Sequence, residues 1–227
     1  MSGLRLASKL QIGGKHTINT DTVGGDHVKK EIVWPHGHQA AAMICIMLDA
    51  EFIWLGMDPE KYDTPKHRSM GEYGPRRGIN RILEALDRFQ VKATFFAPGI
   101  FAETYPEQLK EIAEAGHEIA LHGYRHEDFG GLSKEQQQSV LNRGAKAIEQ
   151  TIGRMPVGFR LPEGGCTEET LTLIQQAGFL YDNSFFDHDI PYRIPGSGAY
   201  ADMIEIPTRW ELIDFPYLAW GDSFPAG

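Results

Sequence analysis

Hydrophobic and polar positions along the chain follow two different periods. Short, nearly continuous apolar runs closed by polar residues are typical of strands buried on both faces. Between them lie segments with apolar residues three and four positions apart, the spacing of amphipathic helices. The pattern predicts strands within residues 41–52, 91–99, 118–123, 157–162, 179–184 and 202–210, and helices within 77–89, 106–116, 133–152 and 167–178.

Local signals mark the ends of several of these helices. Pro106 and Gly116 are residues typical of a helix start and a helix end. Ser133 followed by Gln136 has the pattern of a capping box, and Thr167 is a candidate cap for the next helix. The regular alternation of strand and helix predicts an α/β protein with parallel strands and right-handed crossovers.

Polar residues at the ends of the predicted strands are the candidates for chemistry. Asp49, His122, Arg160 and Asp182 all occupy such positions. In a (β/α) barrel or an open doubly wound sheet, active sites lie at the carboxyl ends of the strands. His122 and His126 are four residues apart, so both can face one ion together with a carboxylate such as that of Asp49. The glycines form neither GxGxxG nor a Walker loop.

Composition narrows the classes of function. A formal net charge of −9 over 227 residues argues against nucleic acid or an anionic membrane as partner. Cys45 and Cys166 form no CxxC pair, which indicates a reducing compartment. The sequence has no signal-peptide pattern and no apolar run of membrane-spanning length, so we expect a cytoplasmic protein. We expect the polar residues 1–33 to form an N-terminal extension and residues 34–227 to form the folded domain.

Six stretches, occurring in order from about Trp34 to Tyr217, give the chain a family resemblance. They are "MLDAEFIWLG", "VKATFFAPG", "AGHEIALHGYRHED", "GFRLPEGG", "YDNSFFDHDIPY" and "IEIPTRWELIDFPY". Together they resemble the polysaccharide deacetylase family, the NodB-homology or carbohydrate esterase 4 group. The branch they resemble most holds peptidoglycan-deacetylase-like, allantoinase-like and cyclic-imidase proteins. The resemblance implies a distorted (β/α) barrel and a divalent metal, often Zn²⁺, that serves amide hydrolysis.

The resemblance also implies roles for individual residues. Asp49, His122 and His126 match the metal-binding Asp-His-His triad of the family. Arg160 matches an arginine that orients the catalytic carboxylate, and the backbone N–H of Glu163 occupies the position of an oxyanion donor. The substrate-binding candidates, in motifs that border the family's pocket, are Trp54, Asp182, Asp189, Tyr192, Trp210 and Asp214.

The chain departs from the family pattern at its expected general base. Many relatives carry an aspartate there, but this chain has Met47, whose thioether takes no proton at neutral pH. Glu51 is the nearest replacement, since its offset of two would keep it on the face of Asp49 if the strand continued. A second register stays open, with Asp49 as base and Glu51 as ligand. The flanking apolar residues favour Asp49 as ligand.

A second departure concerns the end of the domain. The family's last motif carries a histidine that protonates the leaving amine, and here no histidine follows His188. We therefore expect an α/β barrel of the NodB-homology type that is incomplete at the C-terminus and lacks its last strands. Either the sequence is a fragment of a longer chain, or another subunit completes the domain, and we expect a homo-oligomer.

Two classes of function follow. The first is a metal-dependent hydrolase of non-peptide C–N bonds that acts on an N-acetylated amino sugar or on a small cyclic or ureido amide. The alternative is a catalytically degenerate or truncated barrel that binds metal or ligand, or needs a partner subunit to complete it.

Overall fold

A computed structural model describes residue 34 and residues 37–162, 164–194 and 203–220 of the chain. Seven strands within these residues form one sheet in the order β1-β2-β3-β4-β5-β7-β6. Every neighbouring pair is parallel except β6 with β7. The strands are β1 (Cys45–Met47), β2 (Thr94–Ala97), β3 (Glu118–Leu121), β4 (Gly158–Phe159), β5 (Tyr181–Asp182), β6 (Tyr192–Arg193) and β7 (Ile204–Glu205). The predicted α/β class is confirmed, and the open sheet agrees with the expected incomplete barrel.

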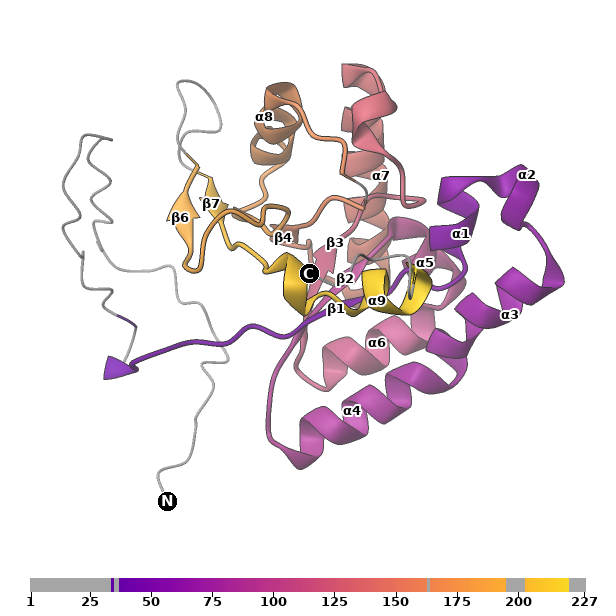
Figure 1. Cartoon of the computed structure of the whole chain (residues 1–227), viewed down its shortest axis with the longest axis horizontal. Coiled ribbons are helices and arrows are strands. Elements are labelled where there is room, and N and C mark those ends of the chain that lie inside the picture. Colours follow the sequence, from indigo (N-terminus) through magenta and orange to yellow (C-terminus); the bar gives the residue numbers. More distant parts are fainter. Residues whose placement is uncertain (1–33, 35–36, 163, 195–202, 221–227) are drawn as a thin grey trace.

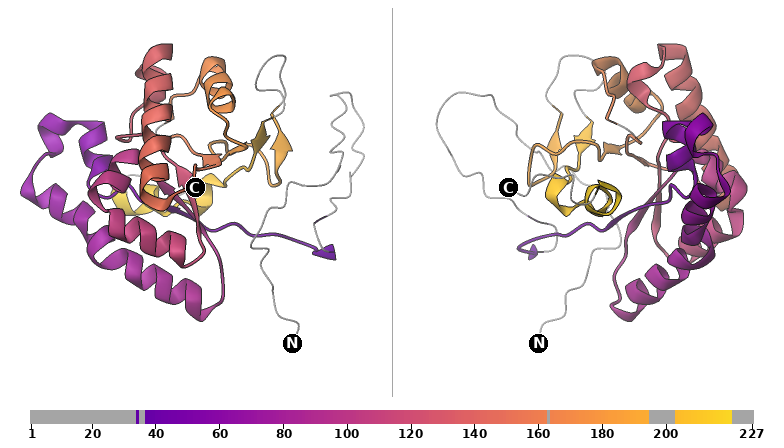
Figure 2. Two further views of the ribbon diagram at one scale, coloured as in Figure 1. Left: turned by 180° about the vertical axis from the view of Figure 1, so that it is seen from behind. Right: turned by 45° about the vertical axis from the view of Figure 1, so that its right-hand side comes forward.

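Helices connect most of the strands (Figure 1). They are α1 (Phe52–Met57), α2 (Pro59–Tyr62), α3 (Pro65–Tyr73), the π-helix η2 (Gly74–Gly78), α4 (Ile79–Arg88), α5 (Gly99–Thr104), α6 (Pro106–Glu114), the 3-10 helix η3 (Phe129–Gly131), α7 (Lys134–Ile152), α8 (Glu168–Gln176), the 3-10 helix η4 (Trp210–Leu212) and α9 (Asp214–Trp220). Figure 2 shows the helices from α4 to α8 on one side of the sheet, with η4 and α9 on the opposite side. No helix of the described residues has the length and apolar character needed to cross a membrane.

Apolar side chains cover both faces of the sheet because successive strand residues point to opposite sides. One face of the sheet packs against the helices through Phe95, Leu121 and Phe159, which belong to the main core. The other face, called here the inner face, carries a smaller cluster of Phe96, Ala120 and Tyr181, with Met47 packed against it. Strand β2 is therefore buried on both faces, as its apolar run predicts.

The predicted caps are confirmed where the helices begin. Ser133 and Gln136 form a reciprocal capping box at the start of α7. Thr167 caps α8 in a second reciprocal pair with Thr170, and Pro106 stands in the first turn of α6. These contacts need only neighbouring residues, so they can be predicted from the sequence.

The prediction of a long first strand is wrong. Strand β1 has three residues and is only half-buried, since it pairs with β2 alone among the described strands. The chain turns at Ala50, whose φ is 48°, and enters α1 at Phe52. Helices α1 to α3 were not predicted, because α3 carries no buried residue and the apolar residues of α1 read as a continuation of the strand.

Candidate metal centre

Three side chains from separate parts of the chain converge at the carboxyl ends of β1 and β3. Asp49 follows β1, His122 directly follows β3, and His126 lies in the loop beyond it. One donor atom of each lies within 4.8 Å of the others. The Nε2 of His122 is 3.5 Å from Oδ1 of Asp49, and the Nε2 of His126 is 3.8 Å from Oδ2. This arrangement favours Asp49, rather than Glu51, as the ligand.

The orientation of His122 is determined by its second ring nitrogen. Nδ1 lies 2.9 Å from the carbonyl oxygen of Arg160. A carbonyl can only accept, so Nδ1 carries the proton and donates it, and Nε2 presents its lone pair toward Asp49. Backbone carbonyls commonly orient metal-binding histidines in this way.

Burial keeps both imidazoles neutral. His122 is 2% exposed and His126 is 3% exposed. Burial lowers the pKa of His122 well below its usual value, with a further lowering from His126, and burial lowers the pKa of His126 to about 4. Neutral imidazole is the form that binds a metal. At neutral pH both rings can therefore act as ligands without first losing a proton.

The donor set fits a zinc ion. Two imidazole nitrogens and one carboxylate oxygen are a common catalytic zinc set that leaves one position open. Ligand atoms about 2.0–2.2 Å from a tetrahedral ion lie roughly 3.3–3.6 Å apart. Oδ1 of Asp49 lies 3.5 Å from His122 and Oδ2 lies 3.8 Å from His126, and one donor atom of each residue lies within 4.8 Å of the others, so a small inward shift would bring the three donors to this spacing.

Arg160 lies beneath this centre, in a buried polar network. Its Nη1 donates to Oδ1 of Asn183 at 2.8 Å and to Oγ1 of Thr208 at 3.0 Å. Burial lowers the pKa of Arg160, although the negative charges of Asp182 and Asp49 nearby act in the opposite direction. Asn183 and Thr208 were not among the predicted site residues, because both lie inside segments predicted as strands. The hydrogen-bond acceptors of Arg160 are thus an amide and a hydroxyl, and its proposed catalytic role stays a prediction.

Glu51 does not continue the strand on which its predicted role depended. It is the residue before α1, and its carboxylate accepts hydrogen bonds from the Tyr105 hydroxyl at 3.0 Å. It is 5% exposed. The period-two argument that paired it with Asp49 is therefore wrong, while its role as general base stays a prediction. Glu163, whose backbone N–H is the predicted oxyanion donor, lies outside the described residues.

Trp54 belongs to an aromatic cluster beside the centre. Its ring lies 5.9 Å from Tyr62, 5.8 Å from His67 and 6.4 Å from Phe215, between ring centroids. Phe215 follows Asp214, the exposed first residue of α9, so this cluster joins the last described helix to α1. Figure 1 shows α9 near α1 and far along the sheet from β7.

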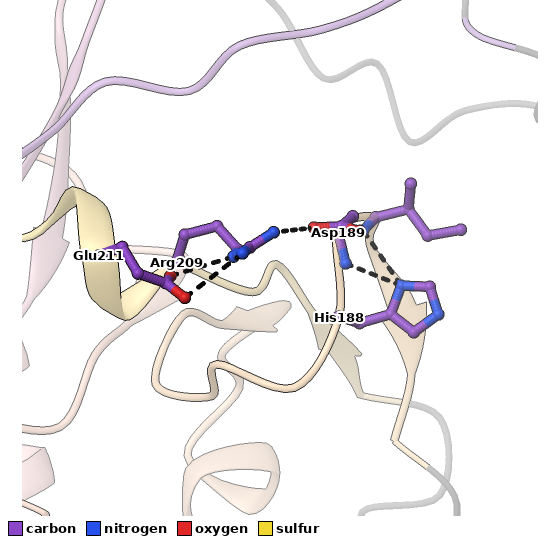
Figure 3. A network of polar contacts seen from close by, with 5 residues as sticks. His188, Asp189, Arg209 and Glu211 are labelled. Carbon is purple, nitrogen blue, oxygen red and sulfur yellow. Dashed lines mark hydrogen bonds and ion pairs between the residues drawn. The ribbon is translucent and has the colours of Figure 1, made fainter. Parts of the chain in front are cut away.

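Asp189 lies in the loop between β5 and β6, and contacts join this loop to Trp210 at the start of η4. Arg209 donates to Asp189 at 2.6 Å and also binds Glu211, as Figure 3 shows. The Nδ1 of His188 accepts the backbone N–H of Asp189 at 3.0 Å. The exposed ring of Trp210 contacts Phe186 edge-on at 5.7 Å. These contacts join the segment between β5 and β6, which carries Asp189, to the segment that begins η4 at Trp210.

Asp182 and Tyr192 contact other groups than the triad. Asp182 is fully buried on β5, accepts from the Ser184 hydroxyl at 2.7 Å and pairs with Glu205. The hydroxyl of Tyr192 donates to Asp187 at 2.7 Å. The structure therefore brings together the three predicted ligands, while the predicted substrate contacts stay predictions.

Comparison with known proteins adds independent findings. The family model described as polysaccharide deacetylase matches residues 71–181. The chain is 36% identical over 165 residues to the peptidoglycan deacetylase-like protein FGM2 of Gibberella zeae, covering 72% of this chain and 49% of that protein. It is 32% identical over 191 residues to the peptidoglycan deacetylase of Helicobacter pylori, covering 74% of this chain and 65% of that protein.

Solved structures show the same fold. A Mycobacterium smegmatis protein assigned as a polysaccharide deacetylase superposes with a TM-score of 0.76 at 39% identity, covering 82% of this chain and 64% of that one. The Puue allantoinase superposes with a TM-score of 0.62 at 29% identity, covering 68% and 51%. The chain thus spans about half to two thirds of the length of these relatives.

Proposed function

Because the chain belongs to the polysaccharide deacetylase family, we propose that it is a metal-dependent hydrolase of non-peptide C–N bonds. The observation that carries this proposal is the convergence of Asp49, His122 and His126 within 4.8 Å at the carboxyl ends of the strands. These residues would hold a divalent cation, with Zn²⁺ as our first choice. When bound, such an ion polarises a carbonyl and makes water a stronger acid.

The protein's own groups would support this chemistry in two ways. The two neutral, buried histidines and the single carboxylate leave the bound ion a net positive charge, which favours an oxyanion nearby. The Arg160 carbonyl keeps the lone pair of His122 directed at the site. We retain Glu51 as the candidate base, and Glu51→Gln should leave metal binding intact while lowering turnover about 100-fold or more.

Two classes of substrate remain in competition. The relatives named peptidoglycan deacetylases support an N-acetylated amino sugar. The likeness to an allantoinase supports a small cyclic or ureido amide. Both classes place a planar C–N carbonyl at the metal, so the triad alone does not separate them.

A degenerate barrel is the second candidate, and Met47 is the observation that favours it. Met47 lies on β1 among the inner-face residues, two positions before Asp49. A thioether there can neither take up nor release a proton at neutral pH. In that case the chain would bind the ion without turning over amides by itself.

Zinc titration of the chain combined with an amide-hydrolysis assay tests the proposal. We expect one Zn²⁺ per chain, and release of amine or acetate from one of the two substrate classes. Asp49→Asn should lose both properties, whereas Asp87→Asn, on the exposed surface of α4, should keep both. One bound ion without turnover would support the degenerate barrel, and no bound ion would refute the metal centre.

A further inference from the structure

The loop that carries both histidines is hydrogen-bonded to the start of α5. Residues 122–127 form this segment, called here the histidine loop. The backbone N–H of Gly99 donates to the carbonyl of Gly123 at 3.0 Å, and that of Ile100 donates to the carbonyl of Tyr124 at 2.9 Å. Gly123 has a φ of +70°, a conformation that suits glycine. The first half of the loop is thereby fixed by backbone contacts.

Tyr124 anchors this first half in the core. Its side chain is buried, and its hydroxyl donates to Glu103 at 2.9 Å. The guanidinium of Arg143 lies 3.8 Å from the centroid of its ring, within the range of a cation–π contact. These contacts hold Tyr124 in place, two residues before His126.

The second half of the loop must hold His126 in an unfavourable backbone conformation. The φ of His126 is +65°, and a left-handed conformation costs a non-glycine residue about 1–2 kcal/mol. Helix α1 packs against the same residue, because a Cβ added to Gly56 would lie 2.7 Å from the His126 carbonyl oxygen. A further contact that closes the loop would help to keep this conformation.

Glu127 supplies that contact. Its Oε2 accepts the backbone N–H of Tyr124 at 2.9 Å, so the side chain reaches back across His126 to the anchored residue. A Cβ at position 123 would lie 3.0 Å from the same oxygen, and the glycine there leaves it room. Glu127 is not among the three residues whose donor atoms converge.

We propose that Glu127 is a positioning residue for the metal centre: its hydrogen bond to Tyr124 fixes the backbone of His126 so that Nε2 meets Asp49. The inference rests on the proposed metal-binding function and adds a residue to it. Groups that orient metal ligands typically affect affinity by about 10–100-fold, and Glu127 acts on His126 through the backbone of the loop, so its loss should be measurable.

Two substitutions separate the hydrogen bond from the charge. Glu127→Gln removes the charge but keeps an oxygen at the same reach, so its Zn²⁺ affinity should stay within about threefold of the original chain. Glu127→Asp keeps the charge but is one methylene shorter, so its affinity should fall about 10-fold or more. Asp128→Ala is the matched control, because that carboxylate caps η3 through Gly130 and lies outside the histidine loop.

The measurement is competition for Zn²⁺ against a chromophoric chelator, with the visible spectrum of the Co²⁺-loaded protein as a second readout. The Glu127→Gln and Asp128→Ala spectra should match that of the original chain, and the saturated Glu127→Asp spectrum should shift. Thermal unfolding without metal shows whether a variant has merely lost stability. Equal affinities for all variants, a Gln variant as weak as the Asp variant, or an unshifted saturated Asp spectrum would overturn the positioning role. If the original chain binds no ion, the proposed function fails as well.

Discussion

At the scale of single residues, the packing of the inner face depends on a glycine, Gly158, which has no side chain. Gly158 on β4 faces the ring of Tyr181, and a Cβ at position 158 would overlap that ring. The Tyr181 hydroxyl donates to Glu118 at 3.0 Å, and Glu118 also accepts from Thr94. The glycine thus makes space for a buried aromatic residue whose polar end joins three strands.

Gly158→Ala should therefore destabilise the fold. Because Tyr181 is packed on all sides, the extra methyl group should cost about 1–3 kcal/mol in the free energy of unfolding. Urea unfolding followed by circular dichroism measures this. Gly131→Ala is the control, since a Cβ there meets no atom within 4 Å, and it should change little. Equal stability of both variants would contradict the packing account.

At the scale of elements, a buried pair of carboxyl groups joins β5 to β7. Asp182 and Glu205 are direct partners across these strands, and both are fully buried. Burial and the nearby charge of Asp182 raise the pKa of Glu205 to about 10, with a smaller contribution from Asp187. Burial also raises the pKa of Asp182, while hydrogen bonds from Glu205 and Ser184 act against that rise. We therefore expect Glu205 to keep its proton at neutral pH and to donate it to Asp182.

This pair predicts a loss of stability toward alkaline pH. The unfolded Glu205 ionises near pH 4.5 and the folded one near pH 10, so its contribution is full below pH 4.5 and lost as the pH rises through 10. In Glu205→Gln the amide can still donate to Asp182 and accept from Phe185. The variant should show a flatter pH dependence of the urea midpoint between pH 5 and 9. The exposed Glu60→Gln control should keep the original slope, and an unchanged slope in Glu205→Gln would argue against the shared proton.

At the scale of the whole molecule, metal binding should couple distant segments. Asp49 follows β1, while the two histidines lie some 70 residues later, beyond β3. An ion held by both stabilises the folded chain, because the unfolded chain does not bring these groups together. The ring contact between Trp54 and Phe215 also joins segments that are distant in the sequence, since it connects α1 to α9.

Zinc should accordingly raise the melting temperature. A free concentration 100 times the dissociation constant adds about 2.7 kcal/mol, which corresponds to roughly 5–10 °C for a domain of this size. Differential scanning calorimetry with and without Zn²⁺ measures the shift. Asp49→Asn should melt at the same temperature in both conditions. A zinc-induced rise in that variant would show that the ion binds elsewhere.

Much of the fold could be predicted because it depends on local patterns. The helices α4, α6, α7 and α8 have clear apolar spacing and recognisable ends, and β2 and β3 are plain apolar runs. The short helices α1 and α2 could not be read in this way, since they bury no residue of their own. The triad was predicted because its motifs are distinctive, whereas Glu127 and Tyr105 act through contacts that the motifs do not reveal.

The sequence by itself determined the strand–helix alternation, the family and the three candidate ligands, because spacing, capping and motifs are properties of neighbouring residues. Only the tertiary structure decided that Asp49 faces both histidines, that Glu51 bonds to Tyr105 and that Asp182 lies beside Glu205 in the buried sheet. These outcomes depend on where the chain turns after each strand and on which side chains then meet. Packing between distant segments sets both, and a linear pattern of residues does not contain that information.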